Sequence, residues 1–499
     1  MKKNSPDFVK DYNKRNFLKQ CLCLSCCGFW SLLNSNNSKI AIAQNILPDL
    51  GDIDRTKIND NEFHELGNNI INQLQFNNKI LDDYDILYYL NQLGNSLAYK
   101  YSARKKYSFL LIKDNQVNAF ALPGNYVCLH QGLIHTTESE AEIVSVISHE
   151  LAHLIQHHIF RNVSISNRNQ LLAMATTISG ALLSPFSPIT GMVLLNTGQA
   201  GSIQNMLYFS REFEKEADRV GQKIMYNSNF DPFAMPAFFA RMQQINQFNN
   251  NNDIAFLQTH PVTLERLSEA YARAKQLKVK HYMRPDSISF LLIKEKCRIN
   301  ILGPKQAIIF YQTVISDKRY NNINIQFYGL ALSYFLLGNS VKSVFYINKI
   351  NNHEINYHYV ILNLKIKQQI FIKNYNTAIK ILEQSHNLYS DNISFYYQHI
   401  NLLIEIKKYR EAKKIIKHCQ EVYPDNVKIW QLNSILYSNN NINNNLYYHY
   451  SLAKMIASKG NIKDAIDQYQ QALKYIKSGD NSMKYLINRE ILQLKQRNI

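Results

Sequence analysis

Two histidines and one glutamate stand at helical spacing in a single apolar stretch of the sequence. His149, Glu150 and His153 form an H-E-x-x-H pattern within residues 140–158. Residues four apart lie on the same face of an α-helix, so the two imidazoles can converge on one metal ion with Glu150 beside it. Neutral imidazoles and a carboxylate suit Zn²⁺, one ion per chain, and such a site leaves one position open for a water that Glu150 can deprotonate.

The alternative is a surface helix that carries these residues by accident. Apolar side chains cover most of this helix and favour its burial, namely Ile143, Val144, Val146, Ile147, Leu151, Leu154 and Ile155. Two buried histidines and a buried glutamate need partners, and a metal ion satisfies all three. Thr137 and Glu140, three residues apart, are expected to form a capping box at the start of the helix.

A second helix, predicted for residues 211–218, supplies the third metal ligand that the first helix lacks. Glu214 would complete the set, and Asp218, one turn later, would accept the N–H of a ligand imidazole. Glu212 and Glu216 are the alternative ligands in the same segment. Without the first helix, this pattern would indicate only a charged, solvated helix face.

The residues before the first helix are expected to build its scaffold. Residues 60–79 and 84–101 have the periodicity of helices. Residues 109–112 and 119–129 are β-branched or aromatic runs typical of strands. A turn signal at 113–115 separates the two β runs and predicts a short antiparallel sheet beside the metal helix. The fold class expected for this part of the chain is therefore α+β and mostly helical.

With both helices in view, the chain resembles the gluzincin metallopeptidases, a group that includes the CAAX prenyl proteases. The pattern of that group is H-E-x-x-H followed by E-x-x-x-D. The resemblance implies zinc ligands at His149, His153 and Glu214, a general base at Glu150, and a supporting catalytic role for Asp218.

Two flanking segments carry the same resemblance. Residues 118–124 with 126–127 look like the strand before the active-site helix, which in such proteases binds the substrate backbone as an added strand. Asn125 departs from the group, where many relatives have a second glycine, but asparagine also tolerates a left-handed backbone.

The segment Thr259-His260-Pro261, followed by Arg266, looks like the T-H-P-x-x-x-x-R segment of the group. The resemblance implies that His260 approaches the zinc ion. It would either stabilise the oxyanion of the transition state or occupy the open position as an inhibitory fourth ligand. Arg266 would help to place the substrate or the same loop.

A closer resemblance is to soluble periplasmic members of this group that carry a C-terminal repeat domain. It extends from about Leu47 to the end of the chain and is specific for the peptidase half, whereas for the repeats it rests on architecture. It implies unfolded or misassembled outer-membrane β-barrel proteins as clients and the barrel assembly machinery as a partner. It also implies a chaperone-like activity separate from cleavage.

Residues 1–43 are expected to be a signal peptide that directs the chain to the periplasm. Basic residues precede an apolar stretch at 21–33, and Ala41-Ile42-Ala43 provides a small-x-small cleavage site. The apolar stretch is too short for a membrane span. A basic tail with an anchoring helix is one alternative, and lipidation at a cysteine of this segment is another.

Composition excludes other classes of function. The net charge of +18 accompanies a chain rich in Asn, Ile, Lys and Tyr, a bias that an AT-rich genome explains, and no clustered Arg-aromatic pattern indicates nucleic acid. Outside the signal segment, Cys128, Cys297 and Cys419 are far apart and odd in number. They predict neither a disulfide framework nor a metal site.

Between the two metal helices, residues 171–197 are apolar but interrupted by Pro185 and Pro188. The polar residues in this segment favour two short helices that cover the cleft and restrict access to extended chains. A transmembrane hairpin and a peripheral membrane contact are the alternatives.

From residue 304 the sequence predicts an all-α tetratricopeptide-repeat domain. Ala378 and Ala412 are 34 residues apart, which is the period of this repeat, and Ala307 and Ser343 extend the series of small residues. The Asn-rich run 439–445 interrupts the pattern and Ala465 resumes it. Such helix pairs form a groove for protein segments, although a plain helical bundle is the alternative.

The sequence therefore predicts three parts: a signal peptide at 1–43, a zinc metallopeptidase domain at 44–285 and a repeat domain at 304–499. Few contacts should cross the boundary between the last two, because the repeats have a core of their own. The predicted function is that of a periplasmic zinc metalloendopeptidase with chaperone-like activity toward outer-membrane β-barrel proteins. The alternative is a repeat-domain assembly factor whose zinc site is largely autoinhibited.

Overall fold

The structure is a computed structural model that describes residues 60–102, 105–162, 210–248, 254–277, 283–424, 426–438, 445–477 and 479–497. The expected signal peptide at 1–43, the segment 171–197 and nearly all of the run 439–445 lie outside the described residues. Within the described ranges, no helix is long and apolar enough to cross a membrane.

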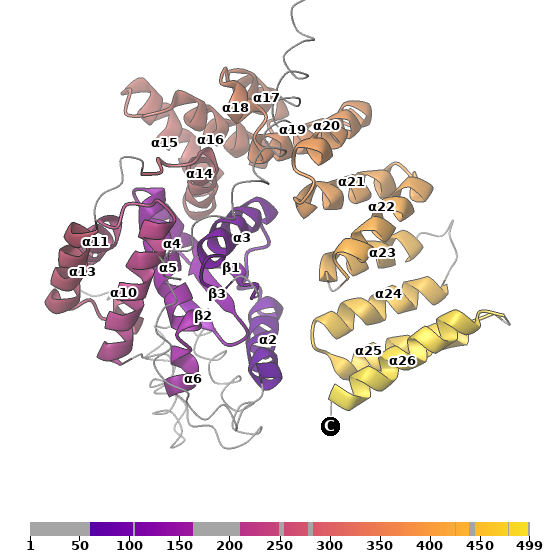
Figure 1. The fold of residues 1–499 in the computed structure, drawn as a ribbon. Coiled ribbons are helices and arrows are strands. Elements are labelled where there is room, and N and C mark those ends of the chain that lie inside the picture. The colour runs from indigo at the N-terminus through magenta and orange to yellow at the C-terminus, as the bar shows by residue number, and fades with distance from the viewer. Residues whose placement is uncertain are drawn as a thin grey trace, which may run out of the picture. The chain divides into compact units, whose positions relative to one another are not determined.

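The peptidase part begins with two helices and a three-stranded sheet (Figure 1). Helices α2 (Asp60–Phe76) and α3 (Tyr84–Ala98) fall where the periodicity predicts them. The sheet consists of β1 (Ser108–Ile112), β2 (Ala119–Leu122) and β3 (Tyr126–His130), in the order β1-β3-β2.

The sheet is mixed, so the prediction of an antiparallel sheet is wrong for one of its two pairings. β2 and β3 form an antiparallel hairpin, whereas β1 and β3 are parallel. The turn at 113–115 does reverse the chain, but β3 inserts between β1 and β2 and separates them. The outer edge of β1 is covered, since the N–H of Leu81 donates to the carbonyl of Leu111 at 2.8 Å.

Helix α5 (Glu140–Ile155), which carries His149, Glu150 and His153, is buried along most of its length. It follows the short α4 (Gln131–Thr136) and lies between the sheet and the helices α10 (Arg211–Asn227) and α11 (Ala234–Phe248) (Figure 1). Burial on several sides explains why apolar residues surround this helix instead of forming one stripe.

The start of α5 is capped two residues later than the sequence suggests. Ser139 is the N-cap, and its hydroxyl accepts from the N–H of Glu142 at 3.3 Å. Glu142 in turn accepts from the N–H of Glu138 at 2.7 Å. Thr137 ends α4 and donates to the carbonyl of Ile134, so the predicted capping box of Thr137 with Glu140 is wrong.

The chain turns sharply after α5. His157 has a φ of 55°, a left-handed conformation, and α6 (His158–Asn162) starts at the next residue. The side chain of His158 therefore returns toward α5 and does not continue along its axis. Helices α12 (Ala255–Thr259), α13 (Leu264–Gln276) and α14 (Ile288–Leu302) complete the elements before residue 304.

The described C-terminal part consists of helices only, which is consistent with helical repeats, and the tetratricopeptide assignment stays a prediction. Its helices are α15 (Pro304–Ser316), α16 (Ile323–Leu336), α17 (Ser340–Asn348), α18 (His353–Asn356), α19 (Tyr359–Phe371), α20 (Tyr375–Leu388), α21 (Ile393–Glu405), α22 (Tyr409–Val422), α23 (Val427–Ser438), α24 (Asn445–Ser458), α25 (Ile462–Lys474) and α26 (Asn481–Arg497).

The small residues of the sequence pattern recur at one structural position. Ala307, Ser343, Ala378, Ala412 and Ala465 are each the fourth residue of a helix, and all five are fully buried. A larger side chain there would separate neighbouring helices, because interiors are close-packed.

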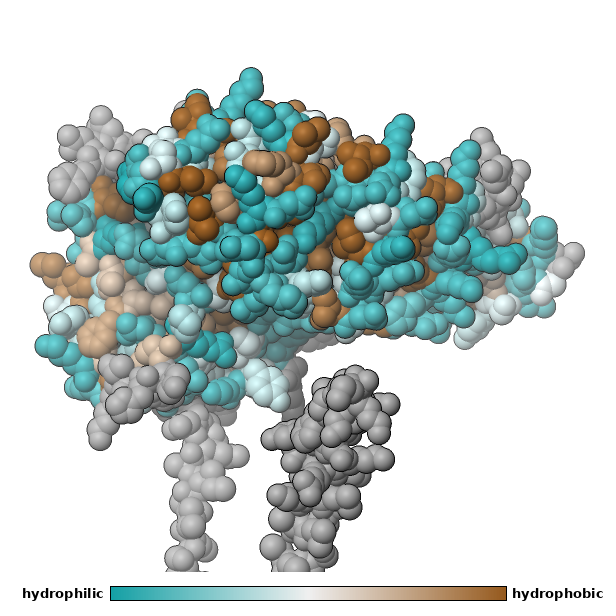
Figure 2. Space-filling view, turned by 90° about the horizontal axis from the view of Figure 1, so that it is seen from above, coloured by the Kyte–Doolittle hydropathy of each residue, from teal (hydrophilic) through white to brown (hydrophobic). Residues whose placement is uncertain are grey.

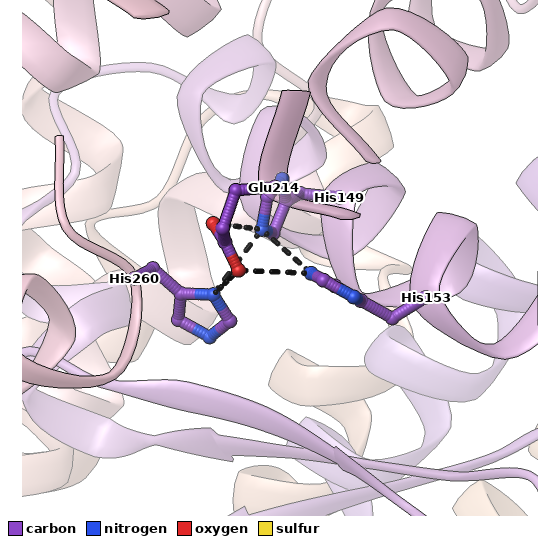
Figure 3. A group of neighbouring side chains, drawn as sticks. All are labelled: His149, His153, Glu214 and His260. Atoms are coloured by element: carbon purple, nitrogen blue, oxygen red, sulfur yellow. Dashed lines mark hydrogen bonds and ion pairs between the residues drawn. The ribbon is translucent and has the colours of Figure 1, made fainter. Parts of the chain in front are cut away.

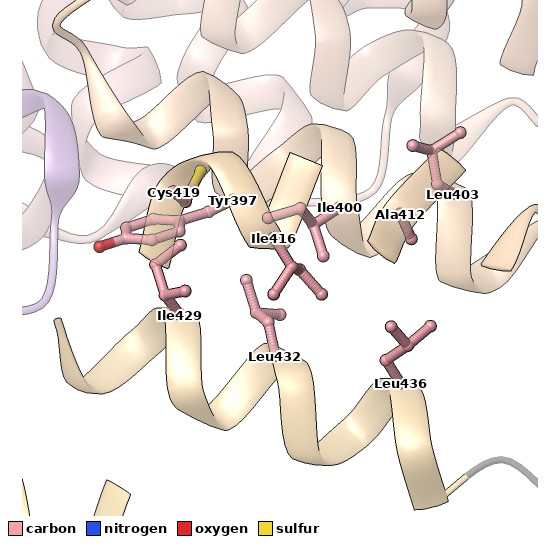
Figure 4. Packing of buried hydrophobic residues seen from close by; sticks show 9 residues of the cluster. All are labelled: Tyr397, Ile400, Leu403, Ala412, Ile416, Cys419, Ile429, Leu432 and Leu436. Atoms are coloured by element: carbon pink, nitrogen blue, oxygen red, sulfur yellow. The ribbon is translucent and has the colours of Figure 1, made fainter. Parts of the chain in front are cut away.

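The packing around one of these small residues is representative (Figure 4). Ala412 and Cys419 of α22 face Ile400 of α21 and Leu432 of α23 in one apolar cluster. From above, the face that includes α15–α20 shows apolar residues interspersed with polar ones (Figure 2). Exposed apolar side chains of α15–α19 include Ile309, Leu336, Val341, Phe345 and Phe371.

Ion pairs connect α3 to α14, and hydrogen bonds connect it to helices after residue 304; the expectation of few contacts across the boundary stays a prediction. Lys296 of α14 lies 2.7 Å from Asp83 and 2.5 Å from Asp85, at the start of α3. Asn363 of α19 also donates to Asp85, and Tyr88 donates to Asp391 at 2.9 Å. Whether 44–285 and 304–499 are separate domains stays a prediction.

Candidate metal centre

Four side chains from three separate elements converge at one buried point (Figure 3). His149 and His153 come from α5, Glu214 from α10, and His260 from the end of α12. Each is at most 2 % exposed, and their ligand atoms all lie within 4.8 Å of one another. The segments that the sequence singles out are thus brought together.

The spacing of these atoms suits a tetrahedral metal ion. Nε2 of His153 is 3.0 Å from Nε2 of His149, and each is 3.4 Å from an oxygen of Glu214. Nδ1 of His260 is 2.9 Å from Glu214 Oε1. Ligand atoms bound at about 2.0–2.1 Å around a tetrahedral zinc ion are roughly 3.3 Å apart, so the donor set fits zinc.

Glu150 is fully buried beside this group. Within the described residues, neither of its oxygens accepts a hydrogen bond of good geometry, although Nε2 of His260 is 3.3 Å from Oε1. Burial raises the pKa of Glu150. A buried carboxylate is costly in a purely structural setting, but a carboxylate with a raised pKa is suited to accept a proton.

Asp218 and Arg266 support the ligands from the side of α10 and α13. Asp218 lies 3.0 Å from Nδ1 of His149, so this nitrogen carries its proton toward Asp218 and Nε2 keeps its lone pair for a metal ion. The guanidinium of Arg266 is bidentate on Asp218, at 2.8 Å for both bonds, and lies 2.8 Å from Glu214.

Arg266 also holds the loop of His260. It donates to the carbonyl of Pro261 at 2.8 Å and is only 2 % exposed. On the other side of the loop, the hydroxyl of Thr259 is 3.4 Å from Oδ1 of Asn118, at the start of β2. Asn125, in the β2–β3 turn, has a φ of 64°, which confirms that asparagine takes the left-handed conformation there.

A second set of supporting residues was missed in the sequence. His158 lies with its Nδ1 2.9 Å from Nδ1 of His153 and its Nε2 3.2 Å from Glu216. Arg161 donates to the same carboxylate at 3.0 Å. Glu216, an alternative metal ligand by sequence, therefore faces His158, and the other alternative, Glu212, is exposed.

This arrangement fixes the proton positions of both histidines. Burial lowers the pKa of His158 to about 4, so its imidazole is neutral near pH 7. Its one N–H must point at Glu216, which leaves Nδ1 to accept from Nδ1–H of His153. The Nε2 lone pair of His153 is then directed at the centre, as a metal ligand requires.

A close helix approach sets the distance between the two metal helices. A Cβ on Gly221 of α10 would lie 3.1 Å from the backbone nitrogen of His149 and 3.2 Å from Ser148. Only glycine allows this contact without a shift of one helix. Because Gly221 is less than one turn from Asp218, it also sets how closely that carboxylate approaches His149.

The charges of the centre call for a divalent cation. Burial disfavours a charge on His149, but Glu214 and Asp218 outweigh it and raise the pKa of His149 to about 10. Metal binding requires neutral imidazoles, and in that state the buried carboxylates of Glu150, Glu214 and Asp218 would carry −3 and Arg266 +1, which leaves −2 for the ion to balance. A zinc ion would balance this charge.

Comparison with known proteins agrees with the geometry. Residues 89–274, which include all the centre's residues, match peptidase family M48, whose members are zinc-dependent. The chain is 34 % identical over 237 residues to the β-barrel assembly-enhancing protease of Yersinia pestis, which covers 47 % of this chain and 49 % of that protein.

Two further relatives support the same assignment. The β-barrel assembly-enhancing protease of Escherichia coli strain K12 is 31 % identical over 233 residues, 46 % of this chain and 48 % of that protein. The mitochondrial metalloendopeptidase OMA1 of Schizosaccharomyces pombe is 27 % identical over 195 residues, 39 % of this chain and 55 % of that protein. The chain thus spans about half the length of the curated relatives it matches, and its match to peptidase family M48 covers residues 89–274.

Proposed function

We propose that this chain is a zinc metalloendopeptidase, with His149, His153 and Glu214 as the zinc ligands. The observation that carries the proposal is the buried convergence of these three side chains beside Glu150, a fully buried carboxylate whose pKa burial raises. A charge of −2 around them supports a divalent metal ion and argues against an incidental cluster of polar residues.

In the proposed mechanism, a zinc ion would polarise the scissile carbonyl and acidify a water molecule. Glu150 accepts the proton of that water and passes it to the leaving amine. Asp218 and His158 keep the Nε2 atoms of His149 and His153 directed at the centre. The edge strand β2 offers backbone groups to which an extended substrate can add as a further strand.

We assign to His260 an inhibitory role at rest. Its Nδ1 is 3.3 Å from Nε2 of His149 and 2.9 Å from Glu214, so it takes the place of a fourth ligand. Four protein ligands are typical of closed, structural zinc sites, whereas catalytic sites keep one position open. Cleavage then requires His260 to move, and Arg266, which binds the carbonyl of Pro261, holds it in the resting position. A direct contact of Arg266 with substrate is the less favoured role, because its guanidinium is buried.

The biological setting follows from the relatives named for β-barrel assembly. The proposed clients are unfolded or misassembled outer-membrane proteins in the periplasm, and the proposed partner is the barrel assembly machinery. The C-terminal helices would recruit them as tetratricopeptide repeats, with a chaperone-like activity that does not need cleavage. The second candidate function is an assembly factor with a largely autoinhibited zinc site, which the complete burial of the centre favours.

Casein digestion by the full chain, with and without a chelator, tests the peptidase function. We expect cleavage that the chelator abolishes, and a Glu150→Gln variant that retains zinc but is slower by about 10² to 10⁴. Cleavage that is insensitive to the chelator would refute a zinc peptidase. No cleavage by the parent under any condition would favour the assembly factor.

The role of His260 is tested by whether its replacement with alanine raises or lowers the rate of cleavage. If His260 occupies the open position, His260→Ala raises casein turnover and self-cleavage. If it only stabilises the oxyanion, the same change lowers turnover by roughly 10² to 10³. The double variant with Glu150→Gln is the control, because any gain that depends on the centre must disappear in it.

A further inference from the structure

A pocket of about 380 Å³ opens directly beside the metal centre, and its charged lining residues are all basic. His153, one of the proposed zinc ligands, forms part of its wall. His64, Lys105, Lys106 and His157 also line it, and no described lining residue is a carboxylate. Such a wall attracts negative charge at the point where a bound peptide would pass the zinc ion.

The lysines are held in place by the fold. The N–H of Lys105 donates to Ser102 at 3.1 Å, and the next residue after Lys106, Tyr107, is fully buried. Asn95 of α3 exchanges two hydrogen bonds with the backbone of Tyr107, at 3.1 and 2.9 Å. The lysine side chains are exposed, but the backbone that carries them is anchored at both ends.

The other wall is fixed by close backbone contact. A Cβ on Gly67 of α2 would lie 1.9 Å from the carbonyl oxygen of Pro123, so α2 rests directly on the β2–β3 turn. His64, one turn earlier on α2, is 3.3 Å from the Cβ position of Gly124 in the same turn. The turn and His64 therefore enter the pocket together.

We propose that this pocket is the substrate subsite that selects an acidic side chain, Asp or Glu, on a residue next to the scissile bond. The carboxylate would lie between Lys105 and Lys106, and the apolar Phe63, Leu154 and Ile159 of the lining would accept the methylene groups. This inference rests on the proposed peptidase function and adds a preference that backbone binding along β2 cannot provide.

The test is a series of quenched fluorescent peptides built on one bond that the full chain cuts in casein. Each peptide carries Glu, Gln or Lys at one of three positions on either side of that bond. At one position we expect kcat/KM to be about fivefold higher for the Glu peptide than for the Gln peptide, which corresponds to the free energy of an exposed ion pair. The Lys peptide should have a lower kcat/KM than the Gln peptide. The preference should shrink between low and high salt, because salt screens exposed charges.

Charge reversal identifies the residues responsible. The Lys105→Glu/Lys106→Glu variant should prefer Lys over Glu at the same position. The matched control is Lys414→Glu/Lys417→Glu on α22, where both lysines are exposed and the change of net charge is the same. Equal kcat/KM for Glu, Gln and Lys at all positions, or the same shift in the control, would overturn the subsite.

A binding measurement separates this inference from the peptidase function. Fluorescence anisotropy of the labelled Glu and Lys peptides with the Glu150→Gln variant needs no catalysis. Tighter binding of the Glu peptide, lost on Lys105→Glu/Lys106→Glu, would support the pocket even in a chain that never cuts. Cleavage of casein together with indifferent peptide binding would retain the peptidase and refute the subsite.

Discussion

Two of the buried groups of ionisable side chains among the described residues differ in how their charges are balanced. In the group at the start of α3, Lys296 lies between Asp83 and Asp85, Asn363 donates to Asp85, and the N-terminus of the helix adds its own positive end. In the metal centre, Glu214 and Asp218 share the guanidinium of Arg266, and Glu150 has no ion pair with an arginine or lysine among the described residues.

This difference separates a structural cluster from a candidate active site. The α3 group contains its own cation, so it can be complete without a ligand. With its imidazoles neutral, as metal binding requires, the centre is short of two positive charges, and it includes the fully buried Glu150. Burial alone would not distinguish the two groups, because Lys296 and Asp85 are almost as inaccessible to water as the metal centre, although Asp83 is partly exposed.

The largest loss of stability is expected when the cation of the α3 group is removed. Lys296→Met leaves Asp83 and Asp85 buried without a cation, which should lower the free energy of unfolding by about 3–5 kcal/mol. Urea unfolding measures this, and Lys305→Met, at an exposed position of α15, is the control. Addition of Asp83→Asn and Asp85→Asn should restore part of the loss. A loss of unfolding free energy below about 1 kcal/mol in Lys296→Met would mean that Lys296 does not stabilise the charges of Asp83 and Asp85.

The next effect concerns the support of the metal ligands. His158→Phe removes the acceptor for Nδ1–H of His153, so zinc affinity should fall about 10- to 100-fold, as for other residues behind metal ligands. Glu216→Gln keeps an acceptor for His158 and should cost less. Competition with a chromogenic chelator measures affinity directly, and the exposed Glu212→Gln is the control. Unchanged affinity in His158→Phe would reduce that histidine to a packing role.

The pH dependence of stability sharpens the comparison. Burial opposes the charge on Asp83, but Lys296 outweighs it and lowers the pKa of Asp83 below its usual range. The stabilisation is therefore present above the unfolded pKa of about 3.9 and is lost as pH falls through the lower folded value. Urea midpoints from pH 7 to 3 should show the gap between parent and Lys296→Met narrowing only at the acid end. A constant gap would contradict this.

The smallest effect is expected at the surface. Asp391 accepts from Tyr88 at 2.9 Å and from Gln92 at 2.5 Å, but it is exposed. Asp391→Ala should lower the free energy of unfolding by less than about 1 kcal/mol, because water competes for these bonds. The same urea titration applies. A loss as large as that of Lys296→Met would show that the surface contact, and not the buried group, joins the two regions.

The residues that local geometry controls were predictable from the sequence. His149 and His153 share a face because helices repeat every 3.6 residues, and Glu214 and Asp218 follow the same rule on a second helix. His158 was missed because its position depends on the left-handed His157, which breaks the helix where the apolar pattern shows no break.

Pairing between distant segments was also beyond the sequence. The sequences of β1 and β3 do not reveal that β3 pairs with β1, because strand order leaves no local pattern in the sequence. The cluster of Lys296 with Asp83 and Asp85 joins residues more than two hundred positions apart. No periodicity links such positions, so the sequence does not reveal this contact.

The hydrogen bonds from α19 to the start of α3 determine where this chain can be shortened. A protein that ends between α14 and α15 retains Lys296 but lacks Asn363 and Tyr359, whose hydroxyl is 3.5 Å from the carbonyl of Asp85. One that ends after Phe371 retains all three. The composition changes near residue 304, but a fragment that keeps the hydrogen bonds to the start of α3 must extend to Phe371. A crystallisation or activity study of the peptidase part should therefore use the longer fragment.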